Sequence, residues 1–363
     1  MAGSSRFAFA LALLCLSASV AAAPCAGFTD VEDTNLFCPN VAWLKNRNIT
    51  LGCEASLYCP AAPVSRLAMA AFLNRLGNVL LPPNVVWVAP LGGQFQSIQA
   101  AIDHVVAHAG FSSSLVKVAP GAYLEQLTIP ANVRVEGSGR GVTEIRAQGG
   151  CAAAPAAAGA VTLHENAQLS RMHVSLFSTA PADCAAVLIV NGAGTPLHDV
   201  LVRIEGDAAV KYGVRLAGGS IDHPVMLDNV EVRANAGFGS SSRAVGVALG
   251  GSVAHEVLLR DVSISAGGPD AVGLLVGDIG VRMDRTRISA FGTALAPPTA
   301  LSVTSTTGML IENGALQAIP AGRAIDQAAG GTLRIATSLL DGSITGTTSC
   351  FATYGPTMGP VAC

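Results

Sequence analysis

The sequence has few charged residues, few aromatic residues and no long apolar run after its N-terminal segment. Charged residues make up 12% of its 363 positions, and its formal net charge at pH 7 is −3. This balance excludes the basic surface with which proteins bind nucleic acid or anionic membranes. A membrane-spanning helix needs a run of about 18 apolar residues, so we expect no transmembrane helix in the mature chain.

Closely spaced metal-binding cysteines are also missing. None of the nine cysteines forms the Cys-x-x-Cys spacing of structural zinc sites, and we therefore expect no metal and no cofactor. The chain is instead rich in glycine (40 residues) and proline (19 residues), and half of its residues are apolar. This composition excludes disorder and is typical of turn-rich β structure.

The N-terminus has the pattern of a secretory signal peptide. Arg6 precedes the apolar run of residues 7–16, and small residues at 20–23 suit cleavage after Ala22. The pattern predicts a signal peptide at residues 1–22 and a secreted, extracellular or cell-envelope protein. Cleavage would remove Cys15 and leave eight cysteines, an even number suited to disulfides in an oxidising compartment.

The eight cysteines fall in neighbouring pairs along the chain. Eight cysteines allow many connectivities, so the sequence alone does not fix the pairing. Local pairing is the simplest prediction, and the last pair would close a C-terminal tail of residues 350–363. The expected disulfides join Cys25 to Cys38, Cys53 to Cys59, Cys151 to Cys184, and Cys350 to Cys363.

A short phrase recurs through the second half of the chain. It consists of a small residue followed by two apolar residues with one free position between them, and it returns every 24 to 33 residues. Such a period predicts a solenoid of short coils, with the free position of each coil facing outward. The phrases begin at Ala160, Ala186, Gly213, Gly246, Gly273, Ala300 and Ala324. The corresponding free positions are Thr162, Leu188, Arg215, Ala248, Leu275, Ser302 and Asp326.

A second recurring phrase identifies each coil as β structure. In Leu227-Asp228-Asn229-Val230-Glu231-Val232, a polar pair precedes apolar residues spaced by two, which is the period of a strand. Because Asn and Asp tolerate the left-handed conformation, each polar pair is expected to form a tight corner between two strands. The first members of these pairs should stack into one outward column, which we interpret as a surface ion ladder. That column contains His198, Asp228, Arg260, Asp284 and Glu312.

Residues 25–81 resemble a single S-layer homology (SLH) repeat, a family with two helices around a loop. The resemblance is carried by the Phe-x-Asp-Val sequence of residues 28–31 and by residues 64–72, where the second helix would lie. Short helices are expected at residues 41–45 and 67–76, with Ser65 as the N-cap of the second. The resemblance implies an SLH-like module at 23–81 and a bacterial source. Its role is either capping and surface association or binding of cell-wall polymer.

Residues 86–139 resemble the first coils of the pectin lyase-like superfamily, and most closely those of pectinesterases. The shared features are a strand at 86–90, a Gln-Ala-Ala-Ile-Asp helix at 99–103 and the segment Gly121-Ala122-Tyr123-Leu124-Glu125. The resemblance implies a right-handed parallel β-helix of about eight coils at 82–349, with a helix covering the open edges of the first coil.

The segments that carry catalysis in pectinesterases are not found after Glu125. Neither an Asp-Phe-Ile-Phe-Gly-like nor a Leu-Gly-Arg-Pro-Trp-like sequence is present, and the polygalacturonase signatures are also missing. We assign no catalytic residue. If the chain were active, Asp228, Asp261 and Asp284 would be the first candidates, because they recur in one corner of successive coils and could share a proton or a cation.

Two further histidines occupy equivalent positions near the ends of two coils. His223 and His255 each precede a strand by two residues, beside Asp222 and Glu256. Two exposed turn residues are the simpler interpretation, and an acid–base or metal site is the alternative.

The sequence thus predicts a secreted or cell-envelope β-helix protein with a non-catalytic binding or surface-structural role, with a cell-wall or extracellular polysaccharide as the expected partner. The alternative is a carbohydrate-active enzyme, pectinesterase-like or polysaccharide lyase-like, that acts on an acidic or esterified polysaccharide. A third hypothesis is a purely structural or adhesive solenoid with a protein partner, because one solenoid scaffold serves many functions.

Overall fold

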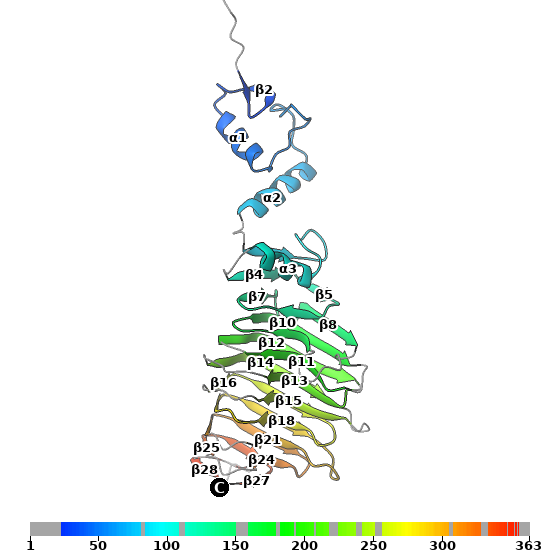
Figure 1. Cartoon of the computed structure of the whole chain (residues 1–363), viewed down its shortest axis with the longest axis vertical. Helices are drawn as coiled ribbons and strands as arrows, with labels where there is room; N and C mark the ends of the chain where they lie inside the picture. The colour runs from blue at the N-terminus through cyan, green and yellow to red at the C-terminus, as the bar shows by residue number, and fades with distance from the viewer. Residues whose placement is uncertain are drawn as a thin grey trace, which may run out of the picture. The chain divides into compact units, whose positions relative to one another are not determined.

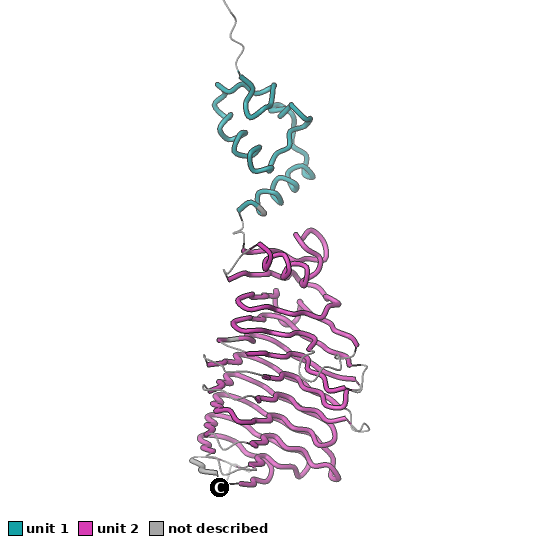
Figure 2. The backbone as a smooth tube through the Cα atoms, in the orientation of Figure 1, with its two compact units in different colours: residues 1–82 teal, residues 83–363 magenta. Residues whose placement is uncertain are grey.

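The computed structural model describes two compact units, residues 1–82 and residues 83–363 (Figure 2). No helix in the described residues is long and apolar enough to cross a membrane. The predicted signal peptide at 1–22 lies outside the described residues. These are residues 23–80, 84–108, 113–149, 159–178, 182–191, 194–206, 208–217, 224–236, 242–250, 256–304, 308–327, 333–346, 348–351, 353 and 355.

The first unit combines a short antiparallel sheet with two helices and two disulfides. One disulfide joins Cys25 to Cys38 and the other joins Cys53 to Cys59, with Cα–Cα distances of 5.7 and 6.0 Å. Each disulfide joins two successive cysteines of the chain, as the predicted local pairing requires. The elements are β1 (Pro24–Cys25), β2 (Phe28–Glu32), α1 (Cys38–Asn46) and α2 (Arg66–Leu80).

The expected local features of this unit are present. The hydroxyl of Ser65 accepts a hydrogen bond from the backbone N–H of Ala68 at 3.0 Å, so Ser65 caps α2 as predicted. Asp30 of the Phe-x-Asp-Val sequence accepts backbone N–H groups from Tyr58 (2.8 Å) and Cys59 (2.6 Å). These hydrogen bonds lower the pKa of Asp30, and the one from the Tyr58 backbone has the largest effect. The motif aspartate therefore ties β2 to the disulfide-closed loop.

The second unit is a right-handed parallel β-helix of about eight coils, as predicted (Figure 1). Each coil contributes strands to three parallel sheets, which we call the first, second and third sheets. The first sheet contains β6 (Leu127–Ile129), β9 (Gly159–Leu163), β11 (Cys184–Val190), β13 (Val210–Ala217), β15 (Arg243–Leu249), β18 (Val272–Val276), β21 (Thr299–Val303), β24 (Arg323–Gln327) and β27 (Ser343–Thr345).

The second and third sheets share three long strands that turn from one sheet into the other. These are β10 (Gln168–Ser178), β12 (Gly194–Gly206) and β14 (Val225–Asn235). The second sheet also contains β3 (Val85–Val88), β4 (Ser114–Val118), β7 (Val133–Glu136), β16 (Val257–Arg260), β19 (Val281–Asp284), β22 (Met309–Glu312), β25 (Leu333–Ala336) and β28 (Thr348–Phe351). The third sheet also contains β5 (Gly121–Tyr123), β8 (Thr143–Gly149), β17 (Ser263–Gly267), β20 (Arg287–Phe291), β23 (Ala315–Ile319) and β26 (Leu339–Asp341).

The second and third sheets meet at a corner where one residue of each coil is left-handed. A positive φ is uncommon outside glycine, and Asn and Asp reach it most easily. The predicted role of the polar pairs is therefore confirmed. The corner residues, with φ between 48° and 55°, are Arg171, Asp199, Asn229, Asp261, Arg285, Asn313 and Thr337.

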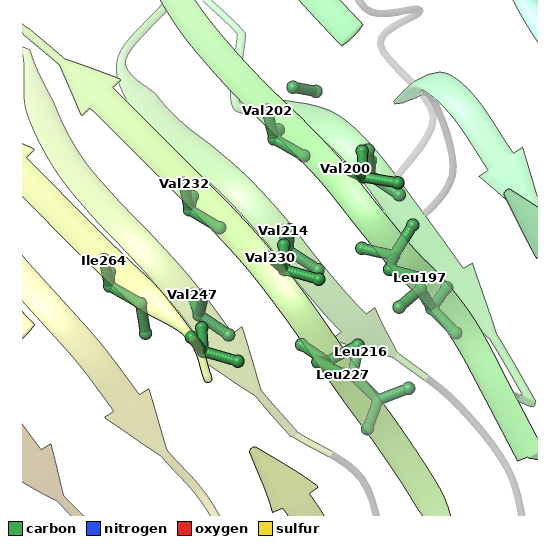
Figure 3. Packing of buried hydrophobic residues seen from close by; sticks show 14 of the residues in the cluster. Leu197, Val200, Val202, Val214, Leu216, Leu227, Val230, Val232, Val247 and Ile264 are labelled. Carbon is green, nitrogen blue, oxygen red and sulfur yellow. The ribbon is translucent and has the colours of Figure 1, made fainter. Parts of the chain in front are cut away.

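The interior of each coil is filled by the apolar members of the two recurring phrases. Leu197 is in register with Leu227, and Val202 with Val232, so like residues stack from coil to coil (Figure 3). The small first residue of the phrase is needed for packing. A Cβ at Gly246 would lie 2.3 Å from a methyl group of Ile264 and 2.5 Å from the Gly273 oxygen. Larger residues there would push the coils apart.

A helix covers the N-terminal end of the β-helix, as predicted. This helix, α3 (Ile98–His108), buries Ile98, Ala101, Ile102 and Val105 in the common core. The carboxylate of Glu125 accepts hydrogen bonds from the N–H groups of Ile98 and Gln99 (both 2.9 Å) and from the Ser97 hydroxyl (2.8 Å). The segment 121–125 thus serves to cap this helix through Glu125.

Candidate functional site

The predicted outward column of the first sheet exists as a continuous line of register partners from Thr162 to Asp326. Two of its members are not open to solvent, since Leu188 is 1% and Ala248 is 8% exposed. Ala248 belongs to an apolar cluster outside the main core, against which Tyr212 packs. The expectation that every free position faces solvent is therefore wrong for these two residues.

The predicted ion ladder at the edge of the second sheet is confirmed by register and by contacts. His198, Asp228 and Arg260 occupy the same position on consecutive coils. Nδ1 of His198 lies 2.9 Å from Oδ2 of Asp228, and Nε of Arg260 lies 2.7 Å from Oδ1 of the same carboxylate. The column continues through Asp284 to Glu312. Each contact joins two different coils.

Arginines bind all three aspartates that would be the first candidates for catalysis. Arg285 binds both oxygens of Asp261 and one oxygen of Asp284, each at 2.7 Å. The guanidinium of Arg260 lowers the pKa of Asp228, and that of Arg285 lowers the pKa of Asp261. Each carboxylate is therefore bound to an arginine, and the lowered pKa values keep Asp228 and Asp261 ionised at neutral pH.

Several predicted positions lie outside the described residues, among them His223, His255, Cys151 and Cys363. Cys184 is disulfide-bonded. In the parts of the chain that the structure describes, no group of three or more His, Cys, Asp or Glu residues could hold a metal ion.

Sequence reasoning missed a charged groove on the outer face of the third sheet. Three arginines share one register column there, with Ser175 between the first two. Each arginine pairs with a glutamate two residues away on its own strand. The pairs are Arg146–Glu144 at 2.8 Å, Arg203–Glu205 at 2.6 Å, and Arg233–Glu231, whose Nε–Oε1 distance is 2.7 Å.

The groove consists of two adjoining hollows of about 460 and 210 Å³. Both are lined by Arg203 and Glu205, so the two hollows adjoin at these side chains. Phe291 lines the larger hollow and Phe177, which is 50% exposed, lines the smaller one. The repeat region therefore has aromatic rings on this face. They are phenylalanines, since both tryptophans of the chain lie before the first recurring phrase.

At one end of the groove, the Glu144 carboxylate accepts hydrogen bonds from neighbouring side chains. It accepts hydrogen bonds from Arg146 and from the Ser175 hydroxyl (both 2.8 Å), and His173 lies 3.6 Å away. Burial alone would raise the pKa of Glu144, but these partners outweigh it and lower the pKa. The Ser175 hydroxyl thus helps to hold the Glu144 carboxylate in place.

His173 lies beside this carboxylate and is mostly covered. Burial is the main cause that lowers its pKa; Arg203, Arg146 and Arg233 add to the effect, and Glu144 opposes it. Among the described residues, its Nε2 is buried and has no hydrogen-bond partner. The ring is therefore neutral at pH 7.

A signal for this groove was present in the sequence. The segments Glu144-Ile145-Arg146, Arg203-Ile204-Glu205 and Glu231-Val232-Arg233 each place two opposite charges on the outer side of a strand whose inner side is apolar. These outward positions lie in the third sheet, after the left-handed corner residue of each coil. The outward columns that the sequence predicted lie in the second sheet, before that corner, and in the first sheet.

No known protein family profile and no curated protein sequence matches this chain. Among solved structures, a pectin methylesterase from Aspergillus niger is 15% identical, with a TM-score of 0.46 and coverage of 76% of this chain and 87% of that one. Pectin methylesterase PemA from Erwinia chrysanthemi is 14% identical (TM-score 0.34; coverage 77% and 90%). ORF18 of Geobacillus virus E2 is 13% identical (TM-score 0.42; coverage 80% and 63%). The β-helix assignment rests on the strand register of this chain rather than on these likenesses.

Proposed function

We propose that this is a secreted or cell-envelope protein with a binding role, in which the third-sheet groove binds an extracellular polysaccharide and takes no part in catalysis. The observation that carries the proposal is the row of half-exposed guanidinium groups beside two phenylalanine rings. An elongated groove that crosses several coils suits a chain molecule better than a small one.

The donors in the groove fit the hydroxyl and carboxylate oxygens of sugars. Arg203 uses Nε and Nη2 on Glu205, and a guanidinium carries five N–H donors, so others remain for a ligand. The rings of Phe177 and Phe291 offer flat apolar surfaces, against which the C–H face of a sugar ring can pack. The groove thus combines the two contact types that a polysaccharide offers.

The charges of the groove support binding without cleavage. Glycoside hydrolysis needs one carboxyl group that stays protonated as the general acid and a second that is ionised. Here each glutamate is paired with an arginine on its own strand, and the pKa of Glu144 is lowered. The Glu144 carboxylate is therefore ionised, and all three glutamates hold the arginines in place.

The first unit would attach the protein to a surface. We propose that residues 23–81 form the SLH-like module, that residues 1–22 are removed on export, and that the pairs Cys151–Cys184 and Cys350–Cys363 are disulfides. The two disulfides of the described first unit fit an oxidising compartment. The β-helix would span 82–349, and the last pair would close the tail of 350–363.

Binding to polysaccharides of different charge tests the role of the groove. The purified mature protein should bind polygalacturonate, methyl-esterified pectin or alginate. The double variant Arg203→Ala/Arg233→Ala should bind at least ten times more weakly, since both guanidinium groups are lost. Arg282→Ala is the matched control, because Arg282 is 49% exposed and pairs with Glu312 on the second sheet. Equal binding by the double variant and the control would refute the proposal.

Chain length measurements test the absence of cleavage. No shortening of the same polymers is expected over long incubation. Release of short oligosaccharides at an enzyme-like rate would instead favour the carbohydrate-active enzyme.

Deletion of residues 25–81 tests the role of the first unit. If this unit is the attachment module, the shortened protein should still bind soluble polymer but no longer sediment with cell-wall material. Retention on wall material after the deletion would place surface recognition on the β-helix.

A further inference from the structure

A serine, a histidine and an aspartate occupy the same outward position on three consecutive coils of the second sheet. Ser170 is in register with His198, and His198 with Asp228. Neighbouring parallel strands lie about 4.8 Å apart. The histidine therefore lies between the hydroxyl and the carboxylate, which is the order of groups in a serine hydrolase site.

The contacts of Asp228 orient this histidine. Oδ2 of Asp228 lies 2.9 Å from Nδ1 of His198, while Oδ1 accepts a hydrogen bond from Nε of Arg260 at 2.7 Å. The Asp228 side chain is only 13% exposed. Arg260 thus fixes the carboxylate, and the carboxylate holds the proton of His198 on Nδ1. This tautomer leaves Nε2 as the free base, on the part of the ring that points away from Asp228.

We propose that Ser170, His198 and Asp228 form a site that hydrolyses acyl esters. The Ser170 oxygen forms a bond to the acyl carbon while its proton passes to Nε2 of His198. The ester C–O bond then breaks, and the alcohol leaves with that proton. Water attacks the acyl-serine with His198 again taking a proton, the bond to Ser170 breaks, and the proton returns to the serine oxygen. One ester and one water give one acid and one alcohol.

A neighbouring loop brings positive charge to this column. The guanidinium of Arg140 lies 2.9 Å from Asp199 and donates to Asn229 at 3.3 Å; these corner residues follow His198 and Asp228. The backbone N–H of Gly137 donates to the carbonyl of Ser170 at 2.9 Å, so the loop runs beside the serine. The charge of Arg140 is paired with Asp199, and Glu136, the register partner of Ser170 on the side away from His198, is paired with Arg171.

The exposure of the column indicates the class of substrate. The His198 side chain is 46% exposed, on the open face of a sheet. Such a site suits an O-acyl group that projects from a larger molecule, such as an acylated polymer. This activity goes beyond the binding role proposed above, and it does not depend on the third-sheet groove.

A serine-reactive fluorophosphonate and 4-nitrophenyl acetate test the site in the full mature chain. The probe should label Ser170, as identified by peptide mass spectrometry, and the protein should hydrolyse the acetate. Ser170→Ala should abolish the label, and His198→Gln should lower both the labelling rate and kcat/KM at least 100-fold. The matched control is Ser302→Ala, since Ser302 is an outward, partly exposed serine on the first sheet.

Asp228→Asn separates an orienting role from a purely structural one. If Asp228 orients His198, this variant should lower kcat strongly with little change in KM, and circular dichroism should show a folded chain. A native protein that is neither labelled nor active would overturn the inference, as would labelling that persists in Ser170→Ala. Polysaccharide binding by the groove would survive either result, so the two proposals fail separately.

Discussion

Ion pairs on the second and third sheets are built differently. On the second sheet and its corner, the described ion pairs other than Arg285–Asp284 join different coils; for example, Arg260 binds Asp228, and Arg285 binds Asp261. On the third sheet, partners lie two residues apart on one strand, as with Arg203 and Glu205. The first arrangement links coils to each other, whereas the second only balances charge within a coil.

This difference assigns different roles to the two surfaces. A pair that joins coils adds to the cohesion of the solenoid, in which each repeat is stabilised by its neighbours. A pair within a strand forms whether or not the next coil is in place. Its arginine therefore contributes little to stability and is available for a ligand.

The largest expected effect is the loss of Asp228, the best-covered member of the inter-coil pairs. Asp228→Ala removes the acceptor for both His198 and Arg260 and should lower the free energy of unfolding by about 2 kcal/mol, the usual value for hydrogen bonds to a charged group. Glu205→Ala, its counterpart on the third sheet, should change stability by at most about 0.5 kcal/mol. Thermal and denaturant unfolding of both variants measures this difference, and equal losses would contradict the comparison.

The inter-coil pairs should also make the protein sensitive to acid. The pKa values of Asp228 and Asp261 are lowered from 3.8 in the folded chain. Their stabilisation is present above the unfolded pKa and is lost as pH falls through the lower folded value. The melting temperature should therefore fall below about pH 4, and it should fall less in Asp228→Ala than in the native chain. An unchanged acid dependence in that variant would remove Asp228 from this role.

The smallest expected effect on stability is that of Arg203→Ala. Arg203 is 51% exposed and pairs only within its strand, so its loss should change the free energy of unfolding by at most about 0.5 kcal/mol. High salt should matter equally little, because exposed pairs are already screened. The same variant should weaken polysaccharide binding measurably. A large loss of stability would show that the groove pairs are structural.

Much of the fold could be predicted because its information is local and repeated. The spacing of apolar residues gave the strands, and the small residue of each phrase marked the point where coils pack closely, as at Gly246. The polar pairs gave the left-handed corners, since Asn and Asp reach that conformation at low cost. The Gln-Ala-Ala-Ile-Asp sequence at 99–103 predicted the helix that covers the first coil.

The site was predicted less well because it depends on outward residues that no repeat constrains. Leu188 and Ala248 were expected to face solvent, but both are covered. The guanidinium groups of Arg203 and Arg233 share a groove only because the coils align them. A period of two says which side of a strand a residue faces, but not what lies beside it on the next coil.

The sequence by itself determined the coil repeat, the register columns and the corners of this protein. These follow from hydrophobic periodicity and backbone preference, which act within a few residues. Only the tertiary structure decided which charges line the groove. Arg203 and Arg233 lie on different coils, but they share one register position and line the same hollow, because the parallel stacking of coils of unequal length aligns them.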